Sequence, residues 1–314
     1  MPLSLRRGTV TAILEQYEGL TRIEVDGMPC VSYPRLTGPV ELGDEVLVNV
    51  QARELELGSG GFDILYANLT RGLELQAEEG AHVMVLPYTP LQHARVHAEE
   101  EGERAASLDG MPVVCCSLHS QVAPVCAALD GLRVAYVQLG GGALPVSLSD
   151  TVRALKERGL VTTAIAVAPC FDGDVQCVSV ASALSWAREE HDVSVCAIGP
   201  GIVGTGTRFG HGGLAAAEAA NAAQALGGRP VVAVRTSEAD ERERHRGISH
   251  HTQAVVDLSS GEPAFAEAAD GWRDACAGLP LEHMGRGPDE DPAFFAAAFA
   301  AGRRARDMVA PLSA

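Results

Sequence analysis

The stretch Val193-Ser194-Val195-Cys196-Ala197-Ile198 runs straight into Gly199-Pro200-Gly201-Ile202-Val203-Gly204. An uninterrupted run of β-branched and small apolar residues is typical of a strand that is buried on both faces of a sheet. The alanine-rich stretch from Leu214 to Leu226 then has the length of a helix that crosses back over that sheet. Strand, glycine-rich loop and helix in this order predict a parallel α/β fold.

The same arrangement recurs elsewhere in the chain. Helical stretches such as Asp150 to Arg158 and Val178 to Glu190 lie between further apolar runs. Those runs are residues 82–86, 112–116, 133–137, 163–168 and 230–234. Right-handed crossovers through the helices give a doubly wound sheet. We therefore expect a Rossmann-like, doubly wound, mostly parallel sheet over residues 80–260.

Residues 1–75 follow a different pattern, in which apolar and polar residues alternate. The alternation is clearest in residues 9–14, 21–25 and 45–49. A period of two predicts strands, and the glycine turns between them predict a small all-β, barrel-like domain of about five strands. Residues 261–314 are expected to form a helical extension packed on the α/β domain, because Asp291-Pro292 is a good helix start.

Charge and lysine content exclude several classes of function. The formal net charge is −17, and Lys156 is the only lysine of the sequence. We therefore expect no binding to nucleic acid or to anionic membranes. A P-loop needs a lysine after its glycines, and pyridoxal phosphate needs one for its Schiff base. Both classes are excluded, because the loop after Ile198 has no lysine and Lys156 lies on a helix that we expect to be exposed.

The eight cysteines fall mostly inside apolar runs, and no C-x-x-C pair occurs. This pattern is typical of reduced thiols in a core and not of a structural zinc site. Cys170 is accordingly expected to be buried. Asp172 and Asp174 could hold a metal ion or a ribose, but we expect them to cap a helix that begins at Val175. The sequence carries neither a signal peptide nor an apolar span of about 20 residues, so we expect a soluble cytoplasmic protein.

The run from Gly199 to Gly213 contains seven glycines and is the first candidate for a binding site. Backbone N–H groups that no side chain covers can approach an anion closely before the next helix begins. The candidate anion-binding residues are Gly199, Gly201, Gly204, Thr205, Gly206 and Thr207. The alternative is a loop that only turns tightly against a neighbouring strand.

Gly199, Gly201 and Gly204 also match the dinucleotide fingerprint G-x-G-x-x-G. Arg235 follows the next strand, at a position where an arginine can hold the ribose 2′-phosphate of NADP. However, nine further residues separate Gly204 from the alanine-rich helix, whereas the fingerprint opens its helix directly. NADP binding is therefore kept as an alternative, and the sequence names no cofactor.

The polar segment from Arg235 to Thr252 has four arginines and four acidic residues. Balanced charge favours specific ion pairs or a shaped pocket over a nucleic-acid surface. We expect Arg244 and Arg246 to neutralise a bound anion, and we count Arg235 and Ser249 among the candidate ligand-binding residues.

Ser249 is expected to cap a helix that runs from His250 to Asp257. The helix dipole lowers the pKa of histidines in the first turn, which would leave His250 and His251 neutral. Neutral imidazoles can move protons, so His245, His250 and His251 are candidate catalytic residues. Because successive helical residues diverge by about 100°, we expect no metal ion to be shared by His250 and His251. The alternative is that these histidines only cap and pack.

Two motifs together resemble a known family. Gly199 to Thr207 reads G-P-G-I-V-G-T-G-T, and Arg242 to Thr252 reads R-E-R-H-R-G-I-S-H-H-T. They resemble DUF3866, an uncharacterised bacterial family of unknown function, and the resemblance covers nearly the whole chain. It implies no activity, substrate or catalytic residue.

Three functions remain open on these observations. The first is an enzyme that acts on a small anionic molecule, phosphorylated or nucleotide-like, at the carboxyl ends of the strands. The second is an NADP-dependent oxidoreductase. The third is a non-catalytic module whose β-rich domain recruits a partner and whose α/β domain forms a homodimer. In each case we expect a homo-oligomer.

Overall fold

The computed structural model describes residues 3–56, 61–71, 75–102, 104–260, 266 and 268–309. Backbone contacts divide the chain into two compact units, which are described separately. The first unit comprises residues 1–81 and 88–94, and the second comprises residues 82–87 and 95–314.

The first unit is a closed β-barrel, as the alternating pattern predicts. Its strands are β1 (Leu5–Tyr17), β2 (Leu20–Val25), β3 (Met28–Ser32), β4 (Glu45–Asn49) and β5 (Asp63–Asn68), with short helices α1 (Pro34–Thr37) and α2 (Gln51–Glu54). The long strand β1 closes the barrel because it pairs antiparallel with both β2 and β4. Alternate residues such as Val10, Ile23, Val46 and Leu65 point inward and form the core.

The second unit is built on a sheet whose neighbouring strands all run parallel, in the order β11-β10-β9-β12-β8-β13. The strands are β8 (Pro112–Cys116), β9 (Val134–Leu139), β10 (Thr163–Val167), β11 (Val175–Cys177), β12 (Val193–Ile198) and β13 (Arg229–Ala233). Most of their side chains are buried, which explains the continuous apolar runs. The predicted barrel followed by a Rossmann-like α/β domain is therefore confirmed.

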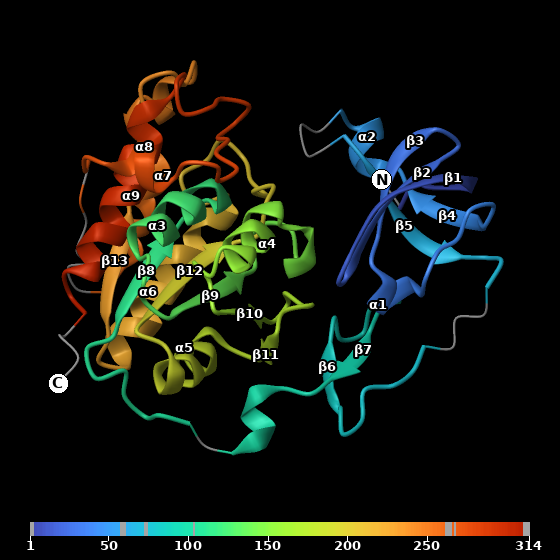
Figure 1. Cartoon of the computed structure of the whole chain (residues 1–314), viewed down its shortest axis with the longest axis horizontal. Helices are drawn as coiled ribbons and strands as arrows, with labels where there is room; N and C mark the ends of the chain where they lie inside the picture. Colours follow the sequence, from blue (N-terminus) through green and yellow to red (C-terminus); the bar gives the residue numbers. More distant parts are fainter. Residues whose placement is uncertain are drawn as a thin grey trace. The chain divides into compact units, whose positions relative to one another are not determined.

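Helices cover both faces of this sheet (Figure 1). On one face lie α3 (Val122–Ala128), α4 (Asp150–Glu157), α8 (Trp272–Ala275) and α9 (Pro292–Arg306). The other face carries α5 (Val180–Glu190) and α6 (Ala215–Ala225), with Val255 of α7 (His250–Leu258) in the same core. In α9, Phe294 and Phe295 are fully buried, and Gly302 allows the helix to approach the backbone of Val125 closely.

Two details of the predicted strand pattern are wrong. Residues 82–86 do not form a strand of the parallel sheet, because β6 (Val83–Val85) lies outside it and its Met84 is half exposed. Residues from Val175 onward form β11 and not a helix, so Asp174 caps nothing there. Its carboxylate instead accepts a hydrogen bond from the backbone N–H of Ala164 at 2.8 Å.

The remaining elements are short. They are β7 (His93–Arg95), β14 (Thr236–Ser237) and β15 (Gly247–Ile248), with 3-10 turns η1 (Ala98–Glu101), η2 (His119–Gln121), η3 (Val146–Leu148), η4 (Gly212–Leu214) and η5 (Glu243–His245). None of the helices in the described part of the chain is long and apolar enough to cross a membrane.

The order of the strands reverses direction between β9 and β12. These adjacent strands are followed by helices on opposite faces, because β9 leads to α4 and β12 leads to α6. Open α/β sheets commonly bind ligands near such a switch point. In this protein the two loops at the switch point are hydrogen-bonded to each other, with the backbone N–H of Ala143 donating to the carbonyl oxygen of Pro200 at 2.9 Å.

Candidate functional site

The glycine loop after β12 packs against the loop after β9. A Cβ atom on Gly142 would overlap the carbonyl oxygen of Gly199, and one on Gly141 would overlap the backbone of Gly212. These glycines therefore allow the two loops to contact each other. For Gly199 this agrees with the alternative interpretation, in which the glycine serves close packing and not anion binding. The helix begins only at Ala215, so the loop does not have the geometry of a fingerprint that opens its helix directly.

The outer part of the glycine loop forms a small exposed turn. Gly204 bridges to His211, and the backbone N–H of Thr205 donates to Gly210 at 2.6 Å. The hydroxyls of Thr205 and Thr207 lie 2.9 Å apart. Near Gly206 the closest group from outside the loop is the guanidinium of Arg244, 3.9 Å from the position of a Cβ atom. Gly204, Thr205, Gly206 and Thr207 thus stay accessible, with an arginine beside them.

Four imidazole rings gather next to this turn, in the part of the chain that the structure describes. His211 ends the glycine loop, His245 lies in η5, and His250 and His251 begin α7. The ring of His211 stacks on that of His251 with 3.7 Å between centroids, and lies 5.6 Å from that of His250. The rings of His250 and His251 are 4.5 Å apart, and that of His245 lies 4.9 and 5.1 Å from them.

The expectation that His250 and His251 point too far apart to share a metal ion is wrong. Ligand nitrogens of His211, His250 and His251 all lie within 4.8 Å of one another. The divergence of about 100° holds for the Cα–Cβ bonds of adjacent helical residues. Rotation about the side-chain bonds of the first turn, together with a third histidine from the glycine loop, brings the rings together.

Burial keeps these histidines neutral. Burial, followed by the charge of Arg235, lowers the pKa of His251 to about 2 and that of His245 to about 3. The pKa of His211 is lowered by burial and then by His250, and that of His250 by burial and then by the charge of Arg244. The sequence predicted neutral histidines from the helix dipole, whereas burial is the largest cause of the lowered pKa of each of the four rings.

Arg235 is hydrogen-bonded to one histidine of the cluster. Its Nη1 donates to Nδ1 of His251 at 2.8 Å, and its Nη2 lies 3.7 Å from the carboxylate of Asp240. Both members of this ion pair are buried, and burial lowers the pKa of Arg235 to about 10. Asp240 also pairs with Arg242 at 2.8 Å and with Arg286 at 3.5 Å. Arg235 is therefore part of the interior of the site and not of its surface.

Ser249 is the N-cap of α7, as predicted. Its hydroxyl accepts a hydrogen bond from the backbone N–H of His251 at 3.2 Å and lies 2.8 Å from Nδ1 of His245. One serine thus positions two histidines. Arg246 is exposed, and its Nε donates to the carbonyl oxygen of Asp240 at 2.9 Å.

Several ring nitrogens of the cluster are buried without a hydrogen-bond partner among the described residues. They are Nδ1 and Nε2 of His211 and Nε2 of His250. An unpaired buried polar atom is costly, and such atoms in a native protein commonly mark a site for a ligand, an ion or a catalytic role.

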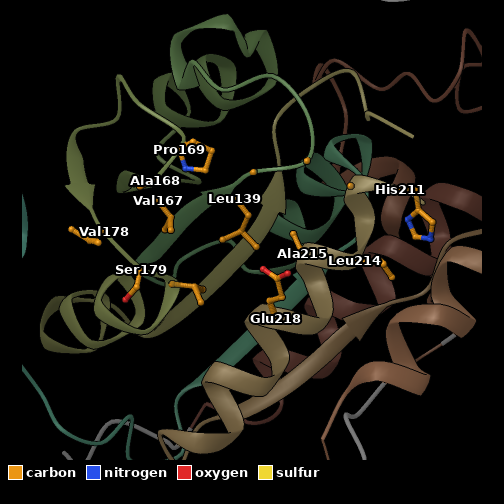
Figure 2. A pocket seen from close by; sticks show the side chains of 14 residues that line it. Leu139, Val167, Ala168, Pro169, Val178, Ser179, His211, Leu214, Ala215 and Glu218 are labelled. Atoms are coloured by element: carbon orange, nitrogen blue, oxygen red, sulfur yellow. The ribbon is translucent and has the colours of Figure 1, made fainter. Parts of the chain in front are cut away.

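A cavity of about 390 Å³ opens at the carboxyl ends of β9 and β10, between the starts of α5 and α6. Figure 2 shows the carboxylate of Glu218 and the hydroxyl of Ser179 among apolar side chains. His211 also lines this cavity, so the cavity and the histidine cluster share one side chain. The lining residues are Leu139, Gly140, Gly141, Val167, Ala168, Pro169, Val178, Ser179, Val180, His211, Gly212, Leu214, Ala215 and Glu218.

A buried histidine of a different kind holds the strand ends together. His119, in η2 after β8, donates from Nδ1 to the carbonyl oxygen of Ile198 at 3.1 Å. Its Nε2 accepts from the hydroxyl of Ser149 at 2.7 Å, and Ser149 in turn caps α4. Cys170 lies nearby and is fully buried, as predicted.

Sequence reasoning did not select His211, Glu218 or Asp240. A histidine inside a glycine-rich loop was the available signal for His211, because glycine loops usually carry few bulky side chains. Glu218 and Asp240 gave no such signal, since acidic residues on a helix and in a charged loop are ordinarily solvated.

Comparison with known proteins gives a family and no activity. The model of the family described as a protein of unknown function, DUF3866, matches residues 29–266. None of the curated proteins matches the chain. Since the match spans most of the sequence, including the glycine loop and the histidine cluster, the chain belongs to the DUF3866 family.

Proposed function

We propose that the second unit is an enzyme that binds a small anionic molecule at the carboxyl ends of its strands and acts on it with neutral histidines. One observation carries this proposal. The guanidinium of Arg244 lies beside the glycine loop, and its charge lowers the pKa of His250, whose buried Nε2 has no hydrogen-bond partner in the described chain.

Arg244 is an available cation. It is exposed and has no carboxylate within ion-pair distance in the described residues, whereas Arg242, two positions earlier, is held by Asp240. A phosphate or carboxylate group can pair with a guanidinium through two parallel hydrogen bonds. Arg246 provides a second exposed guanidinium on the same segment, although its Nε is already used by the backbone of Asp240.

The cavity supports a small organic substrate. Its volume of about 390 Å³ is at the lower end of the range of about 300–1,000 Å³ that is usual for ligand sites. Leu139, Val167 and Pro169 offer apolar walls, and Ser179 and Glu218 offer polar groups that can bind hydroxyls. His211 connects this cavity to the other histidines, so a ligand could reach both.

Neutral imidazoles give the site its reactivity. At neutral pH each ring of the cluster retains a lone pair, because its pKa is lowered. Such a lone pair can accept a proton from a bound molecule or can ligate a metal ion. Both roles require the substrate to lie near His250, where Arg244 would hold its anionic group.

The proposal is tested by calorimetric titration of the full-length protein with inorganic phosphate, AMP and a small dicarboxylate. We expect at least one probe to bind, and Arg244→Ala to weaken it by about 10- to 100-fold, since a hydrogen bond to a charged group contributes about 1.5–3 kcal/mol. The matched control is Arg208→Ala, which removes an exposed arginine of the glycine loop that is already paired with Asp257. Equal losses in the two variants, or no binding of any probe, would overturn the proposal.

A further inference from the structure

We infer that His211, His250 and His251 form a binding site for one divalent transition-metal ion of the zinc type. The inference rests on the proposed function only for what the metal would act on, since metal binding itself can be measured without a substrate. Neither the charge nor the cysteine pattern of the sequence points to this site, because its ligands come from two distant segments and contain no thiol.

The positions of the three histidines are close to those of a metal site. Their ligand nitrogens lie within 4.8 Å of one another. Tetrahedral Zn–N bonds of about 2.0–2.1 Å hold two ligand nitrogens about 3.4 Å apart. The separations of the nitrogens therefore exceed the tetrahedral spacing by at most about 1.4 Å.

Unpaired nitrogens in the cluster also suit a metal ion. The ring nitrogens of His211 and Nε2 of His250 have no hydrogen-bond partner in the described chain. A metal ion would satisfy these buried atoms.

His251 needs a larger adjustment. Its Nδ1 accepts a hydrogen bond from Arg235, so its neutral ring carries the proton on Nε2. Its ring also stacks on that of His211 at an angle of 15°. To ligate, His251 must release Arg235 and tilt away from His211. Arg235 has an alternative partner at hand, because the carboxylate of Asp240 lies 3.7 Å from its Nη2.

The contacts around the three histidines favour a catalytic type of site over a structural one. Ser249 lies against both His245 and the backbone of His251, which fixes the start of α7. Three protein ligands leave a fourth position for water or a substrate atom, as in catalytic zinc sites. The charge of the Arg244 guanidinium, beside Gly206, also acts on His250, so an anionic substrate held by Arg244 would approach that open position.

The test uses the full-length protein without a polyhistidine tag, treated with a chelator and then dialysed against Zn²⁺ or Co²⁺. We expect one equivalent of metal by mass spectrometry and, with Co²⁺, the visible absorption of a four-coordinate ion. A histidine site gives no thiolate-to-cobalt charge-transfer band in the near ultraviolet, which separates it from binding by the eight cysteines.

Variants assign the ligands. We expect His211→Ala, His250→Ala and His251→Ala each to weaken metal binding by at least about 100-fold, more than the usual loss for an outer-shell residue. The control is His191→Ala, which removes a buried histidine bonded to Ala187 and Thr163, at the amino end of β10. Circular dichroism checks the fold, and His211→Gln and His250→Gln repeat the test with polar side chains.

Each outcome is decisive and separable from the proposed function. A wild-type protein that binds no metal at micromolar concentrations overturns the inference, as does full binding by a folded variant of any of the three histidines. Phosphate titration of the metal-free protein is run in parallel. If phosphate binds in an Arg244-dependent way but no metal binds, the proposed function stands and the metal site is wrong. If metal binds but phosphate does not, the metal site stands and the proposed function is wrong.

Discussion

Nη1 of Arg235 lies 2.8 Å from Nδ1 of His251. A guanidinium can only donate, so this contact fixes the tautomer of His251 and joins the end of β13 to the start of α7. The backbone reinforces the connection, because Arg235 N–H donates to the hydroxyl of Thr252 at 2.8 Å and Ser249 N–H donates to the carbonyl oxygen of Arg235 at 2.8 Å. The start of α7, which carries His250 and His251, is therefore held to the segment that follows β13 by three hydrogen bonds.

The charge of Arg235 opposes binding of a cation to the cluster, and its removal should strengthen metal binding. In the buried network, Arg235, Arg242 and Arg286 face two carboxylates, those of Asp240 and Asp291. Arg235→Met leaves two charges of each sign, so we expect the variant to fold. Its Zn²⁺ affinity should rise by at least roughly tenfold, because a positive charge a few ångströms away is lost.

Competition with a chromophoric zinc chelator measures this affinity. Arg273→Met serves as the control, since Arg273 is an exposed arginine of α8 paired with Asp289 at 2.7 Å. Unchanged or weaker zinc binding in a folded Arg235→Met protein would show that Arg235 does not compete with the metal.

His119 makes stability depend on pH. Burial lowers its pKa from 6.5 to about 4. Above pH 6.5 the ring is neutral in both states, so it adds no pH dependence. As the pH falls from 6.5 to about 4, this ring becomes protonated in the unfolded chain but stays neutral in the folded protein. The free energy of unfolding therefore falls by up to about 3 kcal/mol.

Urea unfolding at several pH values tests this effect. Between pH 6.5 and 4, the free energy of unfolding of His119→Gln should fall less steeply with pH than that of the wild type. The difference in slope should correspond to the uptake of about one proton. If His119→Gln and the wild type have the same slope, the buried ring does not titrate as described.

The contact between the two glycine loops should be intolerant of side chains. Gly142→Ala would place a Cβ atom against the carbonyl oxygen of Gly199, and we expect it to lower the free energy of unfolding by about 1–3 kcal/mol. Gly206→Ala is the control, because its Cβ atom meets only the end of Arg244 at 3.9 Å. Thermal unfolding should separate the two variants, and equal melting temperatures would contradict the packing of the loops.

Continuous apolar runs predicted the parallel sheet because its strands are buried on both faces. The pattern misleads for segments that are not buried on both faces. Strand β11 is short and contains Gln176, whose amide donates to the carbonyl oxygen of Cys170, so it does not look like a core strand. Residues 82–86 look apolar, yet Met84 is half exposed and the segment lies outside the parallel sheet.

The candidate site was predictable in outline only. The segment around Ser249 and the glycine loop were both recognisable from the sequence, because their residue types are unusual. The convergence of His211 with His250 and His251 was not, since it depends on how β12, β13 and α7 are brought together in space. The role of Arg235 was equally hidden, because burial and pairing with Asp240 are properties of the folded chain.

The central claim is that Arg244 and the histidine cluster form an anion-binding site at the carboxyl ends of the strands. The most direct test is a crystal of the protein soaked with tungstate, a phosphate-like anion that an anomalous difference map locates without ambiguity. We predict a peak within hydrogen-bond distance of the Arg244 guanidinium and near His250, which is lost in Arg244→Ala crystals. A map with its strong peaks elsewhere, or a peak that persists in the variant, would contradict the account.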